Sequence, residues 1–311
     1  MQFHMRTLLA AALFALGSFA ASGEECSGRL FSSEAVLGGL VCLPAELRRV
    51  VVLDPFYNFV MGRELGLPIV GGATEGFLGS AATREGAEVI ESIGQFTEPN
   101  LETITRLRPD LILGDADLQK DNLALFSKIA PTALIAASDW KVYFRTIAAL
   151  AGQETAAEER LAAFEARAGG IATRMPDVTL SVVRILPGAF QVYVDGPNSY
   201  APYRVLAKAG VRRLAYETAT NDTILKRPDW EGLNELQGDV LFYIVGSGGD
   251  DGAFADLEAE TLAHPLWAIL PAVRNGRMYC VDADTWMGFG GIESAHRALD
   301  DIERYLIDPP K

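Results

Sequence analysis

The chain contains one short segment twice, in altered form. "EPNLETITRLRPDLIL" covers residues 98–113, and "PDWEGLNELQGDVLFYI" covers residues 228–244. In both copies a helical pattern is followed by an aspartate and then by an apolar run that is typical of a buried strand. The matched positions are Leu101 with Trp230, Glu102 with Glu231, Ile104 with Leu233, Leu107 with Leu236, and Asp110 with Asp239. A chain that builds the same helix-to-strand step twice is expected to fold into two α/β units of similar construction.

Short apolar runs alternate with helical patterns in both halves of the chain. The runs are 49–54, 67–71, 111–114 and 132–136 in the first half, and 179–186, 239–246 and 276–282 in the second. This alternation predicts parallel-rich sheets with helices on both faces. Residues 140–175 lie between the halves and predict a long helix, in which Gly152 is a candidate break. The face expected to be buried carries Leu161, Phe164, Ala168 and Ile171.

These patterns predict an α/β fold of two Rossmann-like lobes with a single long helix between them. Ligands of open α/β sheets bind beyond the carboxyl ends of the strands, so two facing lobes predict a ligand cleft between them. The predicted parts are a signal peptide at 1–23, a first lobe with an N-terminal hairpin at 24–150, an interlobe helix at 151–176, and a second lobe at 177–311.

The first 23 residues have the pattern of a secretory signal. His4 and Arg6 give a weakly basic start, the apolar run 8–21 follows, and small residues from Ala20 to Gly23 offer cleavage sites. The run is short for a membrane span, which needs roughly 20 residues. An uncleaved anchor helix is therefore the less favoured alternative, and no membrane insertion is expected after cleavage.

Charge and composition narrow the choice of partners. The chain has 41 acidic and 27 basic residues and a formal charge of −14. This balance argues against nucleic acid and against anionic membrane surfaces as partners. Because 49% of the residues are hydrophobic, the chain can also build a sizeable core.

Export makes the cysteines informative, because disulfides persist in oxidising compartments. Cys26 and Cys42 flank two strand-like runs with a turn at Gly38 and Gly39, so a disulfide that closes this hairpin is favoured. A lipid-modified Cys26 is the alternative, which the two glutamates before it disfavour. Cys280 lies in the apolar run 276–282 and is expected to be a buried thiol without a function.

The sequence contains little that suits metal binding or covalent catalysis. Only His264 and His296 follow the signal, and both are expected to be surface or structural residues, so a histidine-rich metal site is not predicted. HExxH, GxSxG, P-loop and CxxC patterns are absent. The "GSGGDDG" stretch at 246–252 is interpreted as a flexible loop at the cleft rim. Acids such as Asp115 and Asp117 are expected to be solvated, although a secreted enzyme that uses cleft carboxylates remains an alternative.

Five segments in order resemble the periplasmic binding proteins of ferric-siderophore ABC importers, of the ferric-hydroxamate and ferric-citrate type. The segments are "GQFTEPNLETITRLRPDLIL", "FSKIAPT", "GPNSYAPYRVLAKAG", "HPLWAILPAVRNGRMYCVDADTW" and "GGIESAHRALDDI". The resemblance covers residues 44–306 and implies two lobes joined by a rigid helix, with little hinge closure. It also implies a monomer without a cofactor of its own, located in the periplasm. Such a protein captures an Fe(III)–siderophore complex, whose iron belongs to the cargo, and delivers it to an inner-membrane permease. A receptor for cobalamin, haem or another bulky cofactor is the alternative within the binding class.

The resemblance and the predicted strand ends together nominate the ligand contacts. Phe96 stands where relatives commonly carry a ligand-binding arginine, and Trp286 matches a cleft tryptophan of the family, with a core tryptophan as the alternative. Phe289 is expected on the same wall. Arg184 lies inside an apolar strand, so its charge needs either an anionic ligand oxygen or an internal salt bridge. Aromatic residues that follow strand ends are Phe56, Tyr57 and Phe77 in the first lobe and Tyr200 in the second. For these residues ordinary packing is the alternative, but together they suggest an aromatic-walled pocket.

The resemblance also implies one docking glutamate on each lobe for the permease. Glu102 matches the first of these positions, with a helix-start acid that favours the helix dipole as the alternative. The second position resembles Ala207 beside Lys208, which provides no acid, so Glu217 or another nearby carboxylate is the candidate substitute.

Overall fold

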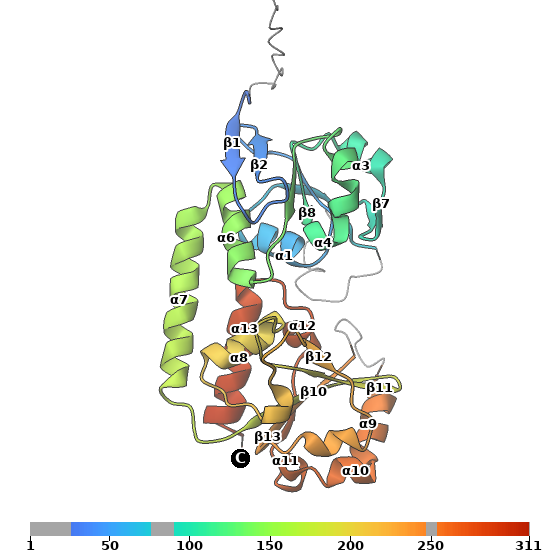
Figure 1. The fold of residues 1–311 in the computed structure, drawn as a ribbon, viewed down its shortest axis with the longest axis vertical. Helices are drawn as coiled ribbons and strands as arrows, with labels where there is room; N and C mark the ends of the chain where they lie inside the picture. The colour runs from blue at the N-terminus through green and yellow to red at the C-terminus, as the bar shows by residue number, and fades with distance from the viewer. Residues whose placement is uncertain (1–25, 76–89, 247–253, 311) are drawn as a thin grey trace, which may run out of the picture.

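The computed structural model describes residues 26–75, 90–246 and 254–310, which form two α/β lobes beside a long helix (Figure 1). The first-lobe strands are β3 (Val50–Val52), β4 (Ile69–Gly72), β5 (Glu91–Ser92), β8 (Leu111–Asp115) and β9 (Thr132–Ile135). They form a sheet in the order β5-β4-β3-β8-β9, and every neighbouring pair is parallel. A small antiparallel pair, β6 (Gly94–Gln95) and β7 (Glu98–Pro99), lies beside it.

The second-lobe sheet has the corresponding order but mixed directions. Its strands are β10 (Leu180–Leu186), β11 (Ala189–Tyr193), β12 (Leu225–Lys226), β13 (Val240–Val245) and β14 (Met278–Cys280). The order is β12-β11-β10-β13-β14. Strands β10, β13 and β14 are parallel, whereas β11 is antiparallel to both β10 and β12. The predicted parallel-rich α/β fold is thus confirmed, but the sequence analysis missed β11.

The two aspartates of the repeat, Asp110 and Asp239, have the same structural role in their lobes. The Asp110 carboxylate accepts hydrogen bonds from the backbone N–H groups of Arg48 at 2.7 Å and Arg49 at 3.1 Å, directly before β3. The Asp239 carboxylate accepts from the backbone N–H and the hydroxyl of Thr179, both at 2.8 Å, directly before β10. In each lobe the aspartate of the repeat therefore anchors the start of the central strand.

The helical part of the repeat is less well preserved. The first copy forms α3 (Leu101–Leu107), which the Asn100 side chain caps. The second copy forms only the short 3-10 helix η4 (Gly232–Glu235). The other first-lobe helices are α1 (Tyr57–Glu64), α4 (Ala116–Gln119), η2 (Lys120–Asn122), α5 (Leu123–Phe126) and α6 (Trp140–Ala151).

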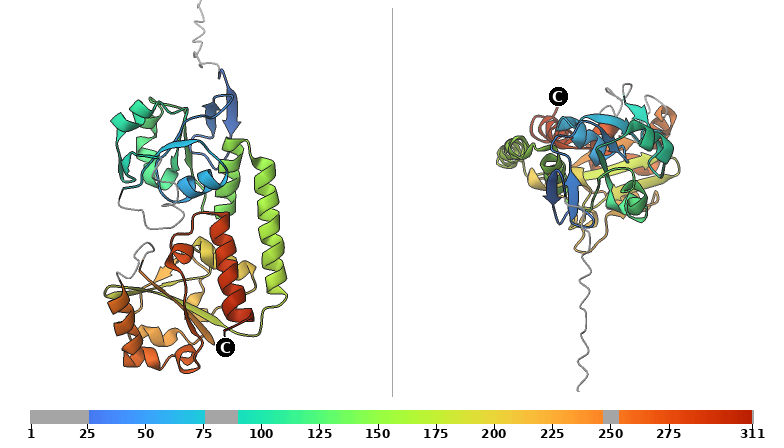
Figure 2. Two further views of the ribbon diagram at one scale, coloured as in Figure 1. Left: turned by 180° about the vertical axis from the view of Figure 1, so that it is seen from behind. Right: turned by 90° about the horizontal axis from the view of Figure 1, so that it is seen from above.

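Residues 140–175 form two helices that are divided at Gly152, the break that the sequence suggested, and the second of them is the predicted interlobe helix. Helix α6 ends at Ala151, and α7 (Glu154–Ala172) begins after Gly152, whose φ of 69° allows the left-handed conformation of a helix end. Helix α7 runs alongside both lobes (Figure 2). Its buried residues include Leu161, Phe164, Ala168 and Ile171, as the apolar spacing predicted.

The second-lobe helices cover both faces of its sheet. They are α8 (Ala201–Lys208), η3 (Ala215–Glu217), α9 (Ala255–Ala263), α10 (Pro265–Ala268), α11 (Pro271–Arg274), α12 (Ala283–Trp286) and α13 (Ile292–Ile302), which continues into η5 (Glu303–Ile307). Helix α13 packs against α7 and α8. Arg167 of α7 donates hydrogen bonds to Asp300 at 2.6 Å and to Glu303 at 2.7 Å, which ties the bridging helix to the second lobe.

The predicted N-terminal hairpin and its disulfide are present. Strands β1 (Arg29–Ser32) and β2 (Leu40–Leu43) pair antiparallel, and Cys26 and Cys42 form the disulfide. The turn of the hairpin bridges to Ile135, so that it covers the β9 edge of the first-lobe sheet. Arg29 donates to the carbonyl oxygens of Ala149 at 3.1 Å and Leu150 at 2.9 Å, near the end of α6. The hairpin therefore braces both the sheet edge and the α6–α7 corner.

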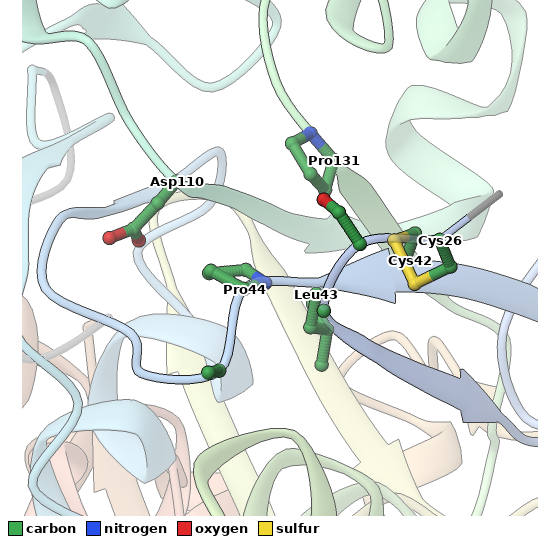
Figure 3. A pocket seen from close by; sticks show the side chains of 9 residues that line it. Cys26, Cys42, Leu43, Pro44, Asp110 and Pro131 are labelled. Atoms are coloured by element: carbon green, nitrogen blue, oxygen red, sulfur yellow. A yellow bond between two sulfur atoms is a disulfide. The ribbon is translucent and has the colours of Figure 1, made fainter. Parts of the chain in front are cut away.

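A cavity of about 550 Å³ lies beside the disulfide (Figure 3). Its lining includes Pro44, Asp110 and Pro131. Asp110 and Pro131 precede β8 and β9, so the cavity lies at the amino ends of the strands. It is thus on the side of the first lobe opposite to the one where ligands of open α/β sheets bind.

Candidate functional site between the lobes

The carboxyl ends of the first-lobe strands face the second lobe. Asp139, which follows β9, forms an ion pair with Arg204 of α8 at 3.0 Å. The Glu64 carboxylate at the end of α1 accepts a hydrogen bond from the backbone N–H of Ile292 at 3.0 Å. We call this surface the inter-lobe face. It consists of the residues that follow the first-lobe strands, such as Asp139, and of their second-lobe neighbours, such as Arg204 and Ile292.

Aromatic residues predicted from the strand ends gather on this face. Phe56 and Phe96 are both half-buried, and their rings meet edge to face with centroids 5.5 Å apart. Tyr57 packs against Tyr143 at 5.1 Å and against Phe289 of the second lobe at 6.5 Å. Phe77 lies outside the described residues. The structure therefore brings Phe56, Tyr57 and Phe96 into one part of the first lobe.

A buried polar cluster lies next to these rings, and most of its members were not predicted from the sequence. The amide nitrogen of Asn58 donates to the Asp54 carboxylate at 2.5 Å and to the Tyr143 hydroxyl at 2.6 Å. The Tyr143 hydroxyl donates in turn to Asp115 at 3.4 Å. Burial raises the pKa of Asp54 to about 7, and burial also raises the pKa of Asp115. The signal in the sequence was "LDPFYN", a run of polar and aromatic residues directly after a buried strand.

The second lobe contributes a cluster around Arg184. Its guanidinium donates to the carbonyl oxygen of Gly246 at 2.7 Å and to the Gln191 side chain at 3.1 Å. Gln191 comes from β11, so this arrangement depends on the strand that the sequence analysis missed. The Tyr193 ring lies 5.5 Å from the Tyr200 ring, and the Tyr200 hydroxyl donates to the Met287 carbonyl oxygen at 2.8 Å.

Trp286 belongs to the second-lobe core rather than to a ligand-contacting wall. Its exposed fraction is 0%, and its indole N–H donates to Asp301 at 2.7 Å. Its ring packs between Tyr203 at 6.1 Å and Phe242 at 5.7 Å. A ligand cannot touch this side chain in the conformation described, so the core alternative applies.

Phe289 is also buried, with an exposed fraction of 3%. Its ring lies 5.6 Å from Trp140 and packs against Tyr57, so it joins the lobes at the base of the inter-lobe face. The expectation that Phe289 lines a ligand wall with Trp286 is therefore wrong for this conformation, because both side chains are enclosed by protein.

The two docking candidates lie in different environments. Glu102 is exposed in the first turn of α3. Glu217 has an exposed fraction of 0%, and its carboxylate accepts from the Val182 backbone N–H at 2.9 Å and from Arg213 at 2.6 Å. The suggestion that Glu217 serves as a docking acid is wrong, since the residue holds the second-lobe core together. Glu231, the counterpart of Glu102 in the repeat, is exposed.

The remaining candidates have structural environments. His264 stacks on Trp230 with ring centroids 3.7 Å apart, and its Nδ1 accepts from the Leu266 backbone N–H, which confirms the structural interpretation. Cys280 is exposed at the end of β14, contrary to the expected burial. Within residues 26–75, 90–246 and 254–310, no group of three or more His, Cys, Asp or Glu side chains is placed to hold a metal ion. In the same residues no helix combines the length and apolarity that crossing a membrane requires.

A model of the periplasmic binding protein family matches residues 78–285, which include parts of both lobes and all of α7. The chain belongs to this family. This agrees with the resemblance that the five sequence segments indicated, and it places the protein among the periplasmic binding proteins.

Two curated relatives match this periplasmic binding protein over nearly its whole length. The probable siderophore-binding lipoprotein YfiY of Bacillus subtilis is 27% identical over 299 residues, which are 92% of this chain and 90% of that protein. The Fe(3+)-citrate-binding protein YfmC of the same organism is 27% identical over 315 residues, with coverages of 96% and 94%. Among solved structures, the iron-uptake system-binding protein FeuA from Bacillus subtilis has a TM-score of 0.74 at 20% identity, and covers 89% of this chain and 100% of its own. This likeness supports the fold of two lobes.

Proposed function

We propose that this periplasmic binding protein captures an Fe(III)–siderophore complex between its lobes and delivers it to an ABC permease in the inner membrane. The observation that carries the proposal is the family match across both lobes, combined with relatives named for siderophore and Fe(3+)-citrate binding. Binding requires no covalent chemistry, and the iron arrives within the cargo. Export through a cleaved signal fits the disulfide between Cys26 and Cys42, which requires an oxidising compartment.

The ligand contacts that we propose come from both lobes. The rings of Phe56, Tyr57 and Phe96 provide apolar and edge surfaces for the organic part of a chelate. Tyr200 and Arg184 are the contacts that we propose from the second lobe, and a guanidinium suits the charged oxygens that coordinate ferric iron. Phe77 remains a candidate contact from outside the described residues.

Docking on the permease uses one exposed glutamate from each lobe in this proposal. Glu102 serves the first lobe, and Glu231 replaces the earlier second-lobe candidates because the internal repeat pairs the two positions and both are exposed. Exposed glutamates that meet cationic partners contribute to the speed and specificity of association. Replacing both by glutamine should slow transport into cells at limiting cargo while leaving cargo binding by the purified protein unchanged.

The direct test is a titration of the mature protein with ferric hydroxamate, catecholate and citrate chelates, followed by haem and cobalamin. Binding is measured by intrinsic fluorescence with inner-filter controls and by calorimetry. Saturable binding of one ferric chelate, weakened about 10-fold or more in Arg184→Met, is the expected result. If only haem or cobalamin binds, that compound is the cargo in place of a ferric chelate. If none of the tested compounds binds, the proposal is wrong.

A further inference from the structure

The first-lobe side of the inter-lobe face carries a carboxylate without a cationic partner. Asp115 follows β8 and is half-buried. Its Oδ1 accepts from the backbone N–H groups of Asp117 at 2.9 Å and Leu118 at 3.3 Å, which caps α4. Its Oδ2 receives only the long hydrogen bond from Tyr143, and no Lys or Arg of the described residues lies within ion-pair distance. One oxygen of Asp115 is therefore available to a strong donor.

The polar groups beneath Asp115 include one described acceptor without a donor. Asp54 is fully buried, and its described partners are the Asn58 amide and the Phe56 backbone N–H. The side-chain oxygen of Asn58 is buried and has no hydrogen-bond partner. One buried acceptor of this cluster is thus unsatisfied, and an unsatisfied acceptor in a low-dielectric setting favours a donor nearby.

The surrounding aromatic groups suit the same kind of ligand. Burial raises the pKa of the Tyr57 phenol, and the charges of Arg204, Asp115 and Asp139 act on it as well. Arg204 is paired with Asp139, so these two charges offset each other and leave that of Asp115. Phe56 and Phe96 form an edge-to-face pair in the same lobe, and ring faces attract an ammonium group.

We infer that the cargo is a ferric chelate that carries a protonated amine, and that Asp115 receives this amine on the first-lobe side of the inter-lobe face. The inference rests on the proposed siderophore-binding function and adds the charge class of the cargo to it. In this orientation the amine meets Asp115 and the aromatic rings, and the iron-coordinating oxygens turn toward Arg184. Asp115 is then a specificity-determining residue that disfavours a carboxylate at the same end of the chelate by like-charge repulsion.

A matched ligand series tests the inference. We would use one linear tris-hydroxamate iron chelate with its terminal amine free, acetylated or succinylated, so that the arm is cationic, neutral or anionic around the same iron centre. The wild-type protein should bind the free-amine form about 10-fold or more tightly than the acetylated form, and the succinylated form most weakly. Calorimetry of the full mature chain measures all three affinities.

Asp115→Asn provides the decisive variant, because asparagine is as good a helix cap as aspartate and keeps α4 in place. It should reduce the preference for the free amine to about 2-fold or less. Asp117→Asn removes the same charge from the exposed first turn of α4 and should retain the preference. Thermal unfolding of both variants checks that neither has lost its fold.

The outcomes separate this inference from the proposed function. Equal binding of all three chelates, a preference for the anionic form, or a preference that Asp115→Asn leaves intact would overturn the amine inference. Binding of a ferric citrate or catecholate chelate and of none of the series would also overturn it, while the siderophore function would stand. Failure to bind any ferric chelate would overturn the proposed function itself.

Discussion

The two lobes share a strand order but differ in the connection that follows the central strand. In the first lobe, β3 leads through α1 into the parallel strand β4. In the second lobe, β10 turns through Gly188, whose φ is 69°, directly into the antiparallel strand β11. The first lobe therefore presents a helix with Tyr57 and Glu64 at the inter-lobe face, and the second presents a hairpin that holds Arg184. An internal repeat can thus preserve the strand order of a sheet, while the connections between strands determine which side chains each lobe presents.

The lobes also differ in the partners of their buried carboxylates. In the second lobe, the buried Glu217 is paired with the buried Arg213. In the first lobe, the buried Asp54 is paired with the neutral Asn58, and its pKa rises to about 7 as a result of burial. A charge that is neutralised internally supports the fold, whereas a buried one that is left with neutral partners tends to take up a proton.

The largest effect is predicted for a substitution that breaks the buried ion pair of Glu217 with Arg213. Arg213→Met leaves the Glu217 carboxylate buried without its cation and should lower the free energy of unfolding by about 3–5 kcal/mol. Arg212→Met is the matched control, because the ion pair of Arg212 with Asp177 is largely exposed and should be worth about 1 kcal/mol or less. Urea unfolding measures both. A loss below about 1 kcal/mol in Arg213→Met would mean that the pair does not support this lobe.

The second prediction concerns the brace that only the first lobe carries. Replacing Cys26 and Cys42 by serine opens a loop with a sequence separation of 16 residues and should cost about 3 kcal/mol, chiefly by freeing the unfolded chain. Hydrogen exchange should show the loss in β1, β2, β9 and the α6–α7 corner. Equal loss of protection in β10 and β13 would contradict the assignment of the brace to one lobe.

The third prediction tests the contact between the lobes. A Cβ atom at Gly291 would overlap the Glu64 carboxylate, and one at Gly290 would lie 2.6 Å from the Val60 side chain. Val60 is branched at Cβ and cannot swing aside, so Gly290→Ala should push α1 away from the start of α13 and cost about 1–3 kcal/mol. Gly170→Ala, in α7 with open space around it, is the control and should be neutral or stabilise by up to about 1 kcal/mol. Similar unfolding midpoints for the two variants would show that the joint tolerates separation.

The fourth prediction concerns a pH dependence of the same joint. Burial raises the pKa of Glu64 from 4.5 to about 7, so the joined lobes bind a proton that the unfolded chain releases. This contribution to stability is complete below pH 4.5 and is lost as the pH rises through about 7. Asp54 and Asp301 act with the same sign, because burial raises the pKa of each, to about 7 and about 6.

Glu64→Gln isolates the glutamate from these other groups. The gain in stability between pH 8 and pH 5 should be smaller in this variant than in the wild-type protein when both are followed by thermal unfolding. Parallel stability curves for the two proteins would refute the role of Glu64 in the joint.

Local patterns were sufficient for much of the architecture. The repeat predicted two lobes, and the apolar spacing of Leu161, Phe164, Ala168 and Ile171 predicted the buried face of α7. The spacing of Cys26 and Cys42 around a strand–turn–strand pattern predicted the disulfide. These features depend on residues close in the chain, or on a periodicity that a single element carries.

Tertiary structure alone decided which side chains reach the inter-lobe face. Trp286 and Phe289 were expected to meet a ligand, yet Tyr203, Phe242 and Trp140 enclose them, and all three come from distant parts of the chain. Glu217 was expected on the surface, yet β10 and Arg213 bury it.

The sequence by itself determined the two-lobed architecture, the bridging helix and the disulfide-closed hairpin, because each follows from hydrophobic periodicity or from short-range chain geometry. It did not determine that Asp54, Asn58, Tyr143 and Asp115 form one cluster, since Tyr143 reaches the other three from α6, which follows β9, the last strand of the first-lobe sheet. Burial and hydrogen bonding between such residues depend on how the elements pack, and packing is a property of the whole chain.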